Sequence, residues 1–158
     1  EMSQVLREVK CCTKAGDVFN LSLAELDMGY RTSKVKQEGL IALEAVVELK
    51  AGDPGEIREK MDDLNRRRRE KQPLGQASAG STFKRPPGYY AAKLIDDANL
   101  RGVCVGGAQV SPIHCGFVVN QGNATAGDIL ALIERIRGEV RTKFNVELEL
   151  EVQVIGED

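Results

Sequence analysis

The spacing of apolar residues divides the chain into short strands and helices that alternate along its length. Apolar positions alternate with polar ones near the start, which is typical of a half-buried strand. Longer segments carry apolar residues three or four positions apart, as on one face of a helix. The pattern predicts strands at residues 4–12, 18–21, 40–50, 103–105, 115–120 and 147–155, and helices at 22–29, 54–71, 89–100 and 125–144.

The predicted helices carry signals at their ends. Thr125 is followed three positions later by Asp128, which is typical of an N-terminal cap. Ser22 and Glu25 form a capping box before a shorter helix that we expect to end at Gly29. The longest helix presents an apolar stripe for a core, made of Ile129, Leu132, Ile133, Ile136 and Val140.

The order of the elements favours an α+β fold with helices packed on a small antiparallel sheet. Ala51-Gly52-Asp53-Pro54 marks a boundary, because Asp53 can cap a helix whose first position suits Pro54. The boundary separates residues 1–50 from a compact domain at 53–158. We expect the first strand of the chain to have an unpaired edge unless another segment covers it.

The composition is that of an ordinary soluble globular protein, with 158 residues, 42% hydrophobic, 29% charged and a formal net charge of -2. No apolar run approaches the ~20 residues needed to span a bilayer, and the start does not resemble a signal peptide. We therefore expect no membrane partner. The near-neutral balance also argues against general nucleic-acid binding, although Arg66–Arg69 form a local basic run.

The cysteines do not predict a metal site. Cys11 and Cys12 are adjacent, Cys104 and Cys115 are far apart, and no C-x-x-C spacing occurs. A zinc site would also need histidines, and His114 is the only one. We interpret the cysteines as reduced thiols of a cytoplasmic protein.

Residues 78–87 (Ser-Ala-Gly-Ser-Thr-Phe-Lys-Arg-Pro-Pro) bring hydroxyl side chains, two cations and turn-forming residues into one short stretch. Small residues around Ser81 allow a ligand to approach the backbone, and Lys84 and Arg85 are donors suited to phosphate or carboxylate. Pro86 and Pro87 hold the exit extended, so we expect a shaped loop and not a strand. Clusters of this kind are also common in plain connections, so composition leaves a functional site and a simple loop both open.

Ala79–Pro86 resembles the signature of the UDP-N-acetylenolpyruvylglucosamine reductase (MurB) family of flavoenzymes. Four further stretches resemble the family in the same order, so the resemblance extends over nearly the whole chain. Together the stretches resemble the family branch with the shorter, simpler substrate domain. These stretches are 29–33 (Gly-Tyr-Arg-Thr-Ser), 71–74 (Lys-Gln-Pro-Leu), 106–111 (Gly-Gly-Ala-Gln-Val-Ser) and 151–156 (Glu-Val-Gln-Val-Ile-Gly).

The resemblance implies that the chain is the C-terminal portion of such an enzyme. Residues 1–50 would be the tail of the FAD-binding domain, and residues 53–158 the substrate-binding domain. The main FAD loops belong to an N-terminal flavin-binding half that would be missing or supplied as another chain. The implied reaction is the NADPH- and FAD-dependent reduction of UDP-N-acetylglucosamine enolpyruvate to UDP-N-acetylmuramate, in peptidoglycan precursor synthesis in the cytoplasm.

The resemblance also assigns residues to roles. Arg31 would face the substrate carboxylate, Ser81 would donate a proton, and Glu151 would complete the polar site. A second group would bind the substrate, namely Lys71 and Arg85 at the diphosphate, together with Tyr30. Some arginines of the 66–69 run would lie near flavin or diphosphate, although their position at a helix end is equally typical of a solvated surface.

Several positions depart from the family pattern, and one motif has a different interpretation when it is considered without the family. Relatives carry a long polar residue at the position of Cys104, and Pro and Arg at those of Leu150 and Gln153. The contacts of these positions with substrate or flavin are therefore in question. Gly106-Gly107 alone is weak evidence for phosphate binding, whereas the family interprets it as a turn between strands.

Two other classes of function compete with the reductase. A serine hydrolase would use Ser81, but its only possible base is His114 and no G-x-S-x-G elbow is present. A non-catalytic module would bind the substrate without turnover, because the flavin-binding half is absent from this chain. Bound flavin absorbs visible light, so a spectrum distinguishes the module from a complete enzyme.

Overall fold

The computed structural model describes residues 1–156. It divides the chain into two compact units, one ending at Ile57 and the other beginning at Arg58. Both combine helices with antiparallel strands, which confirms the α+β class.

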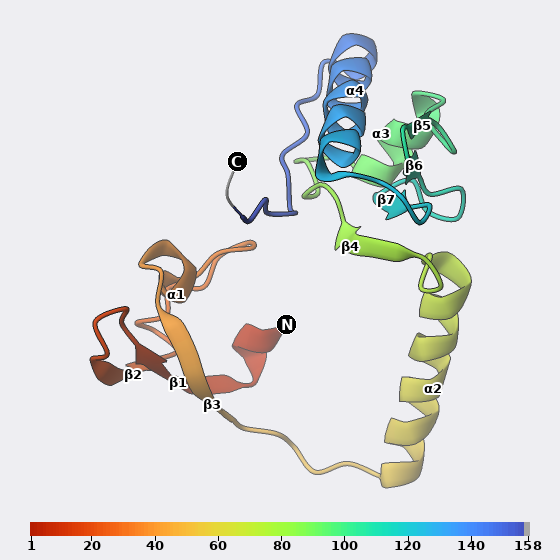
Figure 1. The fold of residues 1–158 in the computed structure, drawn as a ribbon. Coiled ribbons are helices and arrows are strands. Elements are labelled where there is room, and N and C mark those ends of the chain that lie inside the picture. The colour runs from red at the N-terminus through yellow and green to blue at the C-terminus, as the bar shows by residue number, and fades with distance from the viewer. Residues whose placement is uncertain (157–158) are drawn as a thin grey trace. The chain divides into compact units, whose positions relative to one another are not determined.

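The first unit is built on a three-stranded antiparallel sheet (Figure 1). A 3-10 helix, η1, at Met2–Gln4 precedes β1 at Leu6–Cys12 and β2 at Val18–Ser22, and α1 at Lys34–Gln37 precedes β3 at Ile41–Val47. The strand order is β2-β1-β3, so β1 is central and pairs on both sides. The expectation for the first strand allowed for cover by another segment, and β3 provides it, so neither edge of β1 is unpaired. The edges are β2 and β3.

One face of this sheet carries the small core of the first unit. Leu6, Val9 and Cys11 of β1 are buried with Leu21 and Leu26. Every residue of β3 is exposed, although the strand is mostly apolar. The unit therefore has an apolar edge strand that its own residues leave uncovered.

The predicted helix at 22–29 is wrong, although its cap forms. Ser22 N donates to the Glu25 carboxylate at 2.9 Å and Glu25 N donates to the Ser22 hydroxyl at 3.4 Å, as in a capping box. The segment closes successive turns instead of a helix. Asp27 takes a left-handed φ of 43°, which ends helical geometry before a second turn can propagate.

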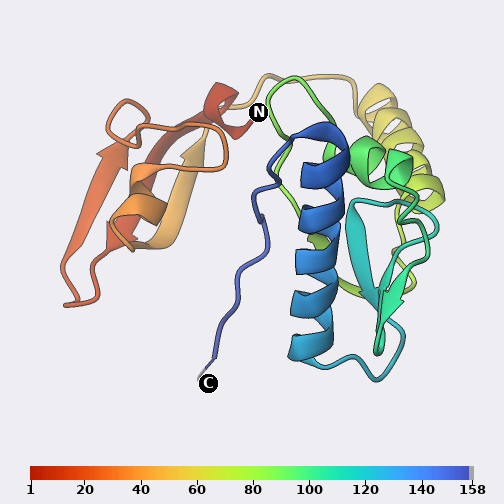
Figure 2. The ribbon, with the colours of Figure 1, turned by 90° about the horizontal axis from the view of Figure 1, so that it is seen from above.

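The second unit contains a four-stranded antiparallel sheet and the longer helices. Its elements are α2 at Pro54–Lys71, which begins before the boundary, β4 at Ala77–Ser81, α3 at Ala91–Asp97, β5 at Cys104–Val105, β6 at Ala108–Val110, β7 at Phe117–Asn120 and α4 at Ala126–Phe144. The strand order is β4-β7-β6-β5. Helix α4 packs against β5, β6 and α3, as Figure 2 shows.

The predicted stripe of α4 forms the core of this unit. Leu132, Ile133, Ile136 and Val140 are buried, and Ile129 is partly buried beside them. The Thr125–Asp128 capping box is present. These predictions are confirmed. The face of α2 that carries Ile57, Met61 and Leu64 is different, because these side chains remain about half exposed.

Two predictions for the second unit are wrong. Residues 77–81 form β4, a strand paired with β7, where a loop was expected. Residues 147–155 form no strand and make one isolated bridge, between Leu150 and Phe83. Leu148 is buried, but Val154 and Ile155 are 69% and 90% exposed. The alternating apolar side chains of this segment therefore do not pack together on one face of a sheet.

No helix of residues 1–156 is both long enough and apolar enough to cross a bilayer. Within the same residues, no three His, Cys, Asp or Glu side chains gather closely enough to hold a metal ion.

Candidate functional site

A bulge in β4 determines where Ser81 lies. Ser78 pairs with Val119 and Ser81 with Phe117, so β4 advances three residues where β7 advances two. Gly80 takes a φ of 86°, a left-handed conformation that suits glycine and accommodates the extra residue. Ser81 is therefore exposed at the end of β4, directly after the irregularity.

Glu151 is held beside Ser81 through Thr82. The backbone N–H of Glu151 donates to the Thr82 carbonyl at 2.9 Å, and Glu151 itself is half-buried. The structure therefore places the backbones of two of the three proposed catalytic residues, Ser81 and Glu151, on neighbouring segments that are far apart in the sequence.

The two cations that follow Ser81 are held in different ways. Lys84 bonds to Glu149 twice, because its ammonium lies 2.8 Å from the carboxylate and its N–H donates to the Glu149 carbonyl. The Lys84 hydrogen bond lowers the pKa of the Glu149 carboxyl. Arg85 donates from Nε to the Tyr89 carbonyl at 3.2 Å, and its guanidinium lies 3.9 Å from the Tyr90 ring centroid. Arg85 is exposed, and these two contacts orient the plane of its guanidinium.

Arg31 and Tyr30 lie in the first unit, in a tight turn from Gly29 to Thr32. Gly29 N donates to the Thr32 carbonyl at 3.0 Å and Thr32 N donates back at 3.4 Å. Arg31 has a φ of 59°, and its guanidinium lies 5.8 Å from the Tyr30 ring centroid. A non-glycine residue in this conformation is strained, and such strain is concentrated at functional sites.

Lys71 is the last residue of α2 and is exposed. The basic run before it is partly neutralised within the helix. Arg66 lies 2.6 Å from Asp63 and 3.0 Å from Glu70, and Arg67 lies 2.7 Å from Asp63. The hydrogen bond from Arg66 lowers the pKa of Asp63. These two arginines are therefore engaged by carboxylates of their own helix.

Gly106-Gly107 is the turn between β5 and β6, as the family resemblance implied. The turn packs against the start of α4, where Asp128 accepts hydrogen bonds from Thr125 N at 2.9 Å and Gly107 N at 3.4 Å. The Thr125 bond lowers the pKa of Asp128. A Cβ on Gly107 would come within 2.5 Å of Ala124 N. The two glycines thus allow close packing, and the neighbouring carboxylate makes the turn unsuitable for a phosphate.

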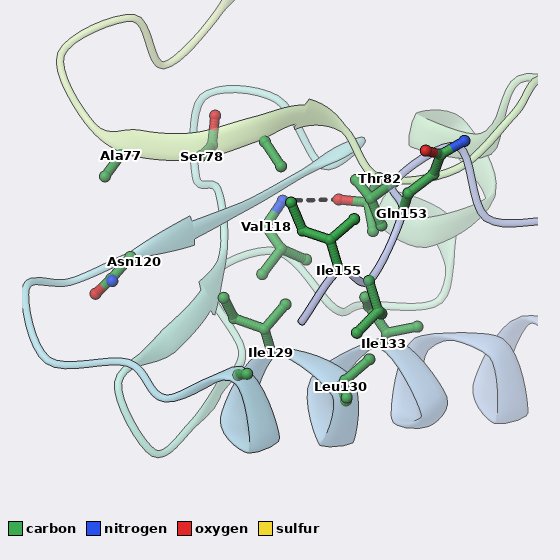
Figure 3. A pocket seen from close by; sticks show the side chains of 14 residues that line it. Ala77, Ser78, Thr82, Val118, Asn120, Ile129, Leu130, Ile133, Gln153 and Ile155 are labelled. Carbon is green, nitrogen blue, oxygen red and sulfur yellow. Dashed lines mark hydrogen bonds between the residues drawn. The ribbon is translucent and has the colours of Figure 1, made fainter. Parts of the chain in front are cut away.

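A pocket of about 480 Å³ opens between α4 and the β4–β7 edge of the sheet. Figure 3 shows Ile129 and Ile133 of α4 on one side and Val118 of β7 on the other. Its lining is mainly apolar and includes Thr82 and Val152, the chain neighbours of Ser81 and Glu151. Sequence reasoning missed this pocket, because its walls come from segments that only the fold brings together.

The departures from the family pattern lie in separate places. Cys104 is exposed on β5 and its thiol donates to the Gly102 carbonyl at 3.4 Å. Gln153 is exposed and lines the pocket. His114 is engaged by its own turn, since its Nδ1 accepts from Gly116 N at 3.1 Å and its ring packs edge-on against Phe117. This arrangement gives no support to a serine hydrolase.

Comparison with known proteins identifies the family. Residues 72–155 match the model of the C-terminal domain of UDP-N-acetylenolpyruvoylglucosamine reductase. The chain is 51% identical over its full length to UDP-N-acetylenolpyruvoylglucosamine reductases of Clostridium botulinum (strain 657 / Type Ba4) and Geobacillus thermodenitrificans, and covers 52% of each. It thus spans about half the length of the curated relatives it matches.

A solved structure gives the same result for the fold. The crystal structure of UDP-N-acetylenolpyruvylglucosamine reductase (MurB) from Thermus caldophilus matches 96% of this chain with a TM-score of 0.80 and 36% identity. The match covers 54% of the Thermus chain. Because the family model matches more than half of the chain, we conclude that the chain belongs to the UDP-N-acetylenolpyruvoylglucosamine reductase family, in its C-terminal part.

Proposed function

We propose that this chain carries the substrate domain and the catalytic residues of an NADPH- and FAD-dependent enzyme that reduces UDP-N-acetylglucosamine enolpyruvate to UDP-N-acetylmuramate. The family supports the reaction class. The observation that carries the proposal is the placement of Ser81 and Glu151 on adjacent segments joined by the Glu151 N–H to Thr82 carbonyl bond.

Each residue of the site has a distinct task in this proposal. A flavin bound by the other half of the enzyme would supply the hydride chemistry at the terminal vinyl carbon of the substrate. Ser81 donates a proton to the adjacent carbon, which lies next to the carboxylate. Serine is a weak acid, so it acts only against a strongly basic carbon held in a fixed position. Arg31 offsets the negative charge that develops on the carboxylate side, and Glu151 completes the polar site.

The substrate-binding residues fit a nucleotide diphosphate. Arg85 presents a planar fork whose orientation is held by Tyr89 and Tyr90. Lys71, exposed at the end of α2, adds a point charge. Tyr30 is 66% exposed in the turn before Arg31 and supplies an aromatic face for the substrate.

The residues of this chain do not fit a complete flavin site. The chain has one adjacent glycine pair, Gly106-Gly107. The start of α4 occupies the space beside this pair, which faces the Asp128 carboxylate. We therefore assign flavin binding to a half of the enzyme that relatives carry outside the matched region. The exposed apolar strand β3 supports the assignment of residues 1–50 to the tail of the flavin domain, because such a strand requires cover.

The alternative is a substrate-binding module that performs no turnover on its own. The share of the relatives that the chain covers favours this state for the isolated chain, since only about half of each is represented. The two states differ in colour. Purified chain that lacks a flavin-binding half should show no flavin absorbance, whereas the full-length protein should be yellow.

Replacement of Ser81 tests the catalytic assignment. In the full-length protein, Ser81→Ala should leave flavin reduction by NADPH nearly unchanged, because that half-reaction needs no proton donor to carbon. Reoxidation by the enolpyruvyl substrate should slow by about 10²–10⁴-fold, the usual contribution of a positioned general acid. Ser81→Cys should retain more activity, because a thiol can still donate.

Stopped-flow absorbance of the flavin separates the two half-reactions. A Ser81→Ala variant that slows both half-reactions equally, or neither, would show that Ser81 does not donate the proton.

A further inference from the structure

Thr82 is one of two buried polar residues that the structure shows among residues 1–156, and it is only 3% exposed. A buried hydroxyl among apolar neighbours must be hydrogen-bonded to be tolerated. Thr82 meets this requirement through Oγ1, which accepts from the backbone N–H of Val118 on β7 at 3.1 Å. Figure 3 shows this bond between Val118 and Thr82, which both line the pocket.

Both backbone groups of Thr82 are also used. Its N–H donates to the Gly116 carbonyl at 2.8 Å, and its carbonyl accepts from Glu151 N at 2.9 Å. Thr82 therefore bonds on one side to Gly116, just before β7, and to Val118 within it. On the other side it bonds to the C-terminal segment at Glu151. The residue before Thr82 is Ser81.

We propose that Thr82 is a positioning residue, whose hydroxyl fixes the backbone that presents Ser81 and, through its carbonyl, the backbone of Glu151. The inference rests on the proposed function, because it concerns how those two side chains are held. Thr82 itself lies in the buried layer and contacts neither substrate nor cofactor in this proposal.

The need for such an anchor follows from the bulge in β4. The extra residue between Ser78 and Ser81 interrupts the regular ladder with β7 immediately before the site. Gly80 at this point has no side chain to restrict its backbone, and no neighbouring atom lies within 4 Å of its Cβ position to hold it. Without the Thr82 hydroxyl bond, the segment after Gly80 would be tied to β7 by backbone contacts alone. A shift of about 1 Å in a catalytic group can cost about 10²-fold in rate.

The test compares Thr82→Val with Thr82→Ser in the full-length protein. Valine keeps the shape but removes the acceptor of the Val118 N–H, whereas serine keeps the acceptor. Thr82→Val should slow reoxidation of the flavin by the enolpyruvyl substrate by about 10²-fold and leave its reduction by NADPH unchanged. Thr82→Ser should restore most of the rate. If Thr82→Val does not fold, Thr82→Ala replaces it, with the same expectation.

A second measurement does not depend on activity. Amide hydrogen exchange of the segment around Glu151 should be roughly tenfold faster in Thr82→Val than in wild type, and near wild type in Thr82→Ser. Thr125→Val is the matched control, because Thr125 Oγ1 also accepts a backbone N–H, from Asp128 at 3.1 Å, at the start of α4. It should lower the melting temperature without changing reoxidation or exchange around Glu151.

The double variant Ser81→Ala/Thr82→Val separates this inference from the proposed function. If Thr82 acts through Ser81, the second substitution should add little to the loss already caused by Ser81→Ala. Fully additive losses would overturn the positioning role, as would normal reoxidation in Thr82→Val while Ser81→Ala is slow. Normal reoxidation in Ser81→Ala would instead overturn the proposed function, and this inference with it.

Discussion

The Arg31→Gly variant of the protein should be more stable than the Arg31→Ala variant, which is the reverse of the usual order. Its φ of 59° lies in the left-handed region, where the Cβ of an L-residue crowds the following carbonyl oxygen. This crowding costs about 1–2 kcal/mol, and glycine avoids it. Glycine loses part of the advantage through its greater freedom in the unfolded chain. We therefore expect Arg31→Gly to unfold with a free energy about 1 kcal/mol larger than Arg31→Ala.

The comparison isolates the backbone, because both variants remove the same side-chain contacts of Arg31. Urea unfolding followed by circular dichroism measures the difference. A change of 1 kcal/mol corresponds to about 2–4 °C in melting temperature for a protein of 150–250 residues. Arg135, exposed within α4, is the matched control. There Arg135→Ala should be the more stable variant by about 1 kcal/mol, as at an ordinary helical position.

Activity should follow a different order from stability. In the full-length protein both Arg31 variants lose the guanidinium, so both should slow reduction of the enolpyruvyl substrate despite their different stabilities. Arg31→Ala equal to or more stable than Arg31→Gly would refute the strain argument. Full activity in Arg31→Gly would refute its role at the carboxylate.

Two further predictions concern the contact between the β5–β6 turn and α4. Gly107→Ala should lower the free energy of unfolding by about 1–3 kcal/mol, since its Cβ would meet the Ala124 backbone, whereas Gly138→Ala, with open space in α4, should raise it by about 0.5–1 kcal/mol in the same urea titrations. The backbone hydrogen bond from Thr125 lowers the pKa of the Asp128 carboxyl in the folded protein below its ordinary value of 3.8. The stability that the ionised carboxylate adds to the fold is therefore complete above the unfolded pKa and is lost as the pH falls through the folded pKa. The difference in melting temperature between wild type and Asp128→Asn should therefore be constant near pH 7 and shrink below about pH 4; a difference that does not change with pH would contradict this.

The elements predicted well from the sequence are those whose signals are local. Helix α2 begins at Pro54 and ends at Lys71 as predicted, and α4 follows directly after the Thr125 cap. Caps, prolines and helical periodicity act within a few residues, so a single sequence contains them. The core stripe of α4 is buried for the same reason, because its spacing alone defines one face.

The elements predicted wrongly depend on partners that are distant in the sequence. β4 has the composition of a loop and becomes a strand because β7 lies beside it. The alternating segment after Leu148 has the composition of a strand and remains irregular because only the Leu150–Phe83 bridge pairs it. Strand formation reflects packing against neighbours more than intrinsic preference, so composition is a weak guide to it.

The proposed catalytic residues occupy places where regular structure is interrupted. Arg31 lies in a left-handed turn, Ser81 follows a bulge, and Glu151 follows an isolated bridge. Hydrophobic periodicity identifies residues that face a core from a regular helix or strand. It cannot identify residues whose backbone departs from that regular geometry. In this chain their proposed roles rest on motif resemblance alone. Since an interrupted backbone is not held by a ladder, it needs separate anchors, and this is the task that the hydrogen bonds of Thr82 to Gly116, Val118 and Glu151 perform for Ser81 and Glu151.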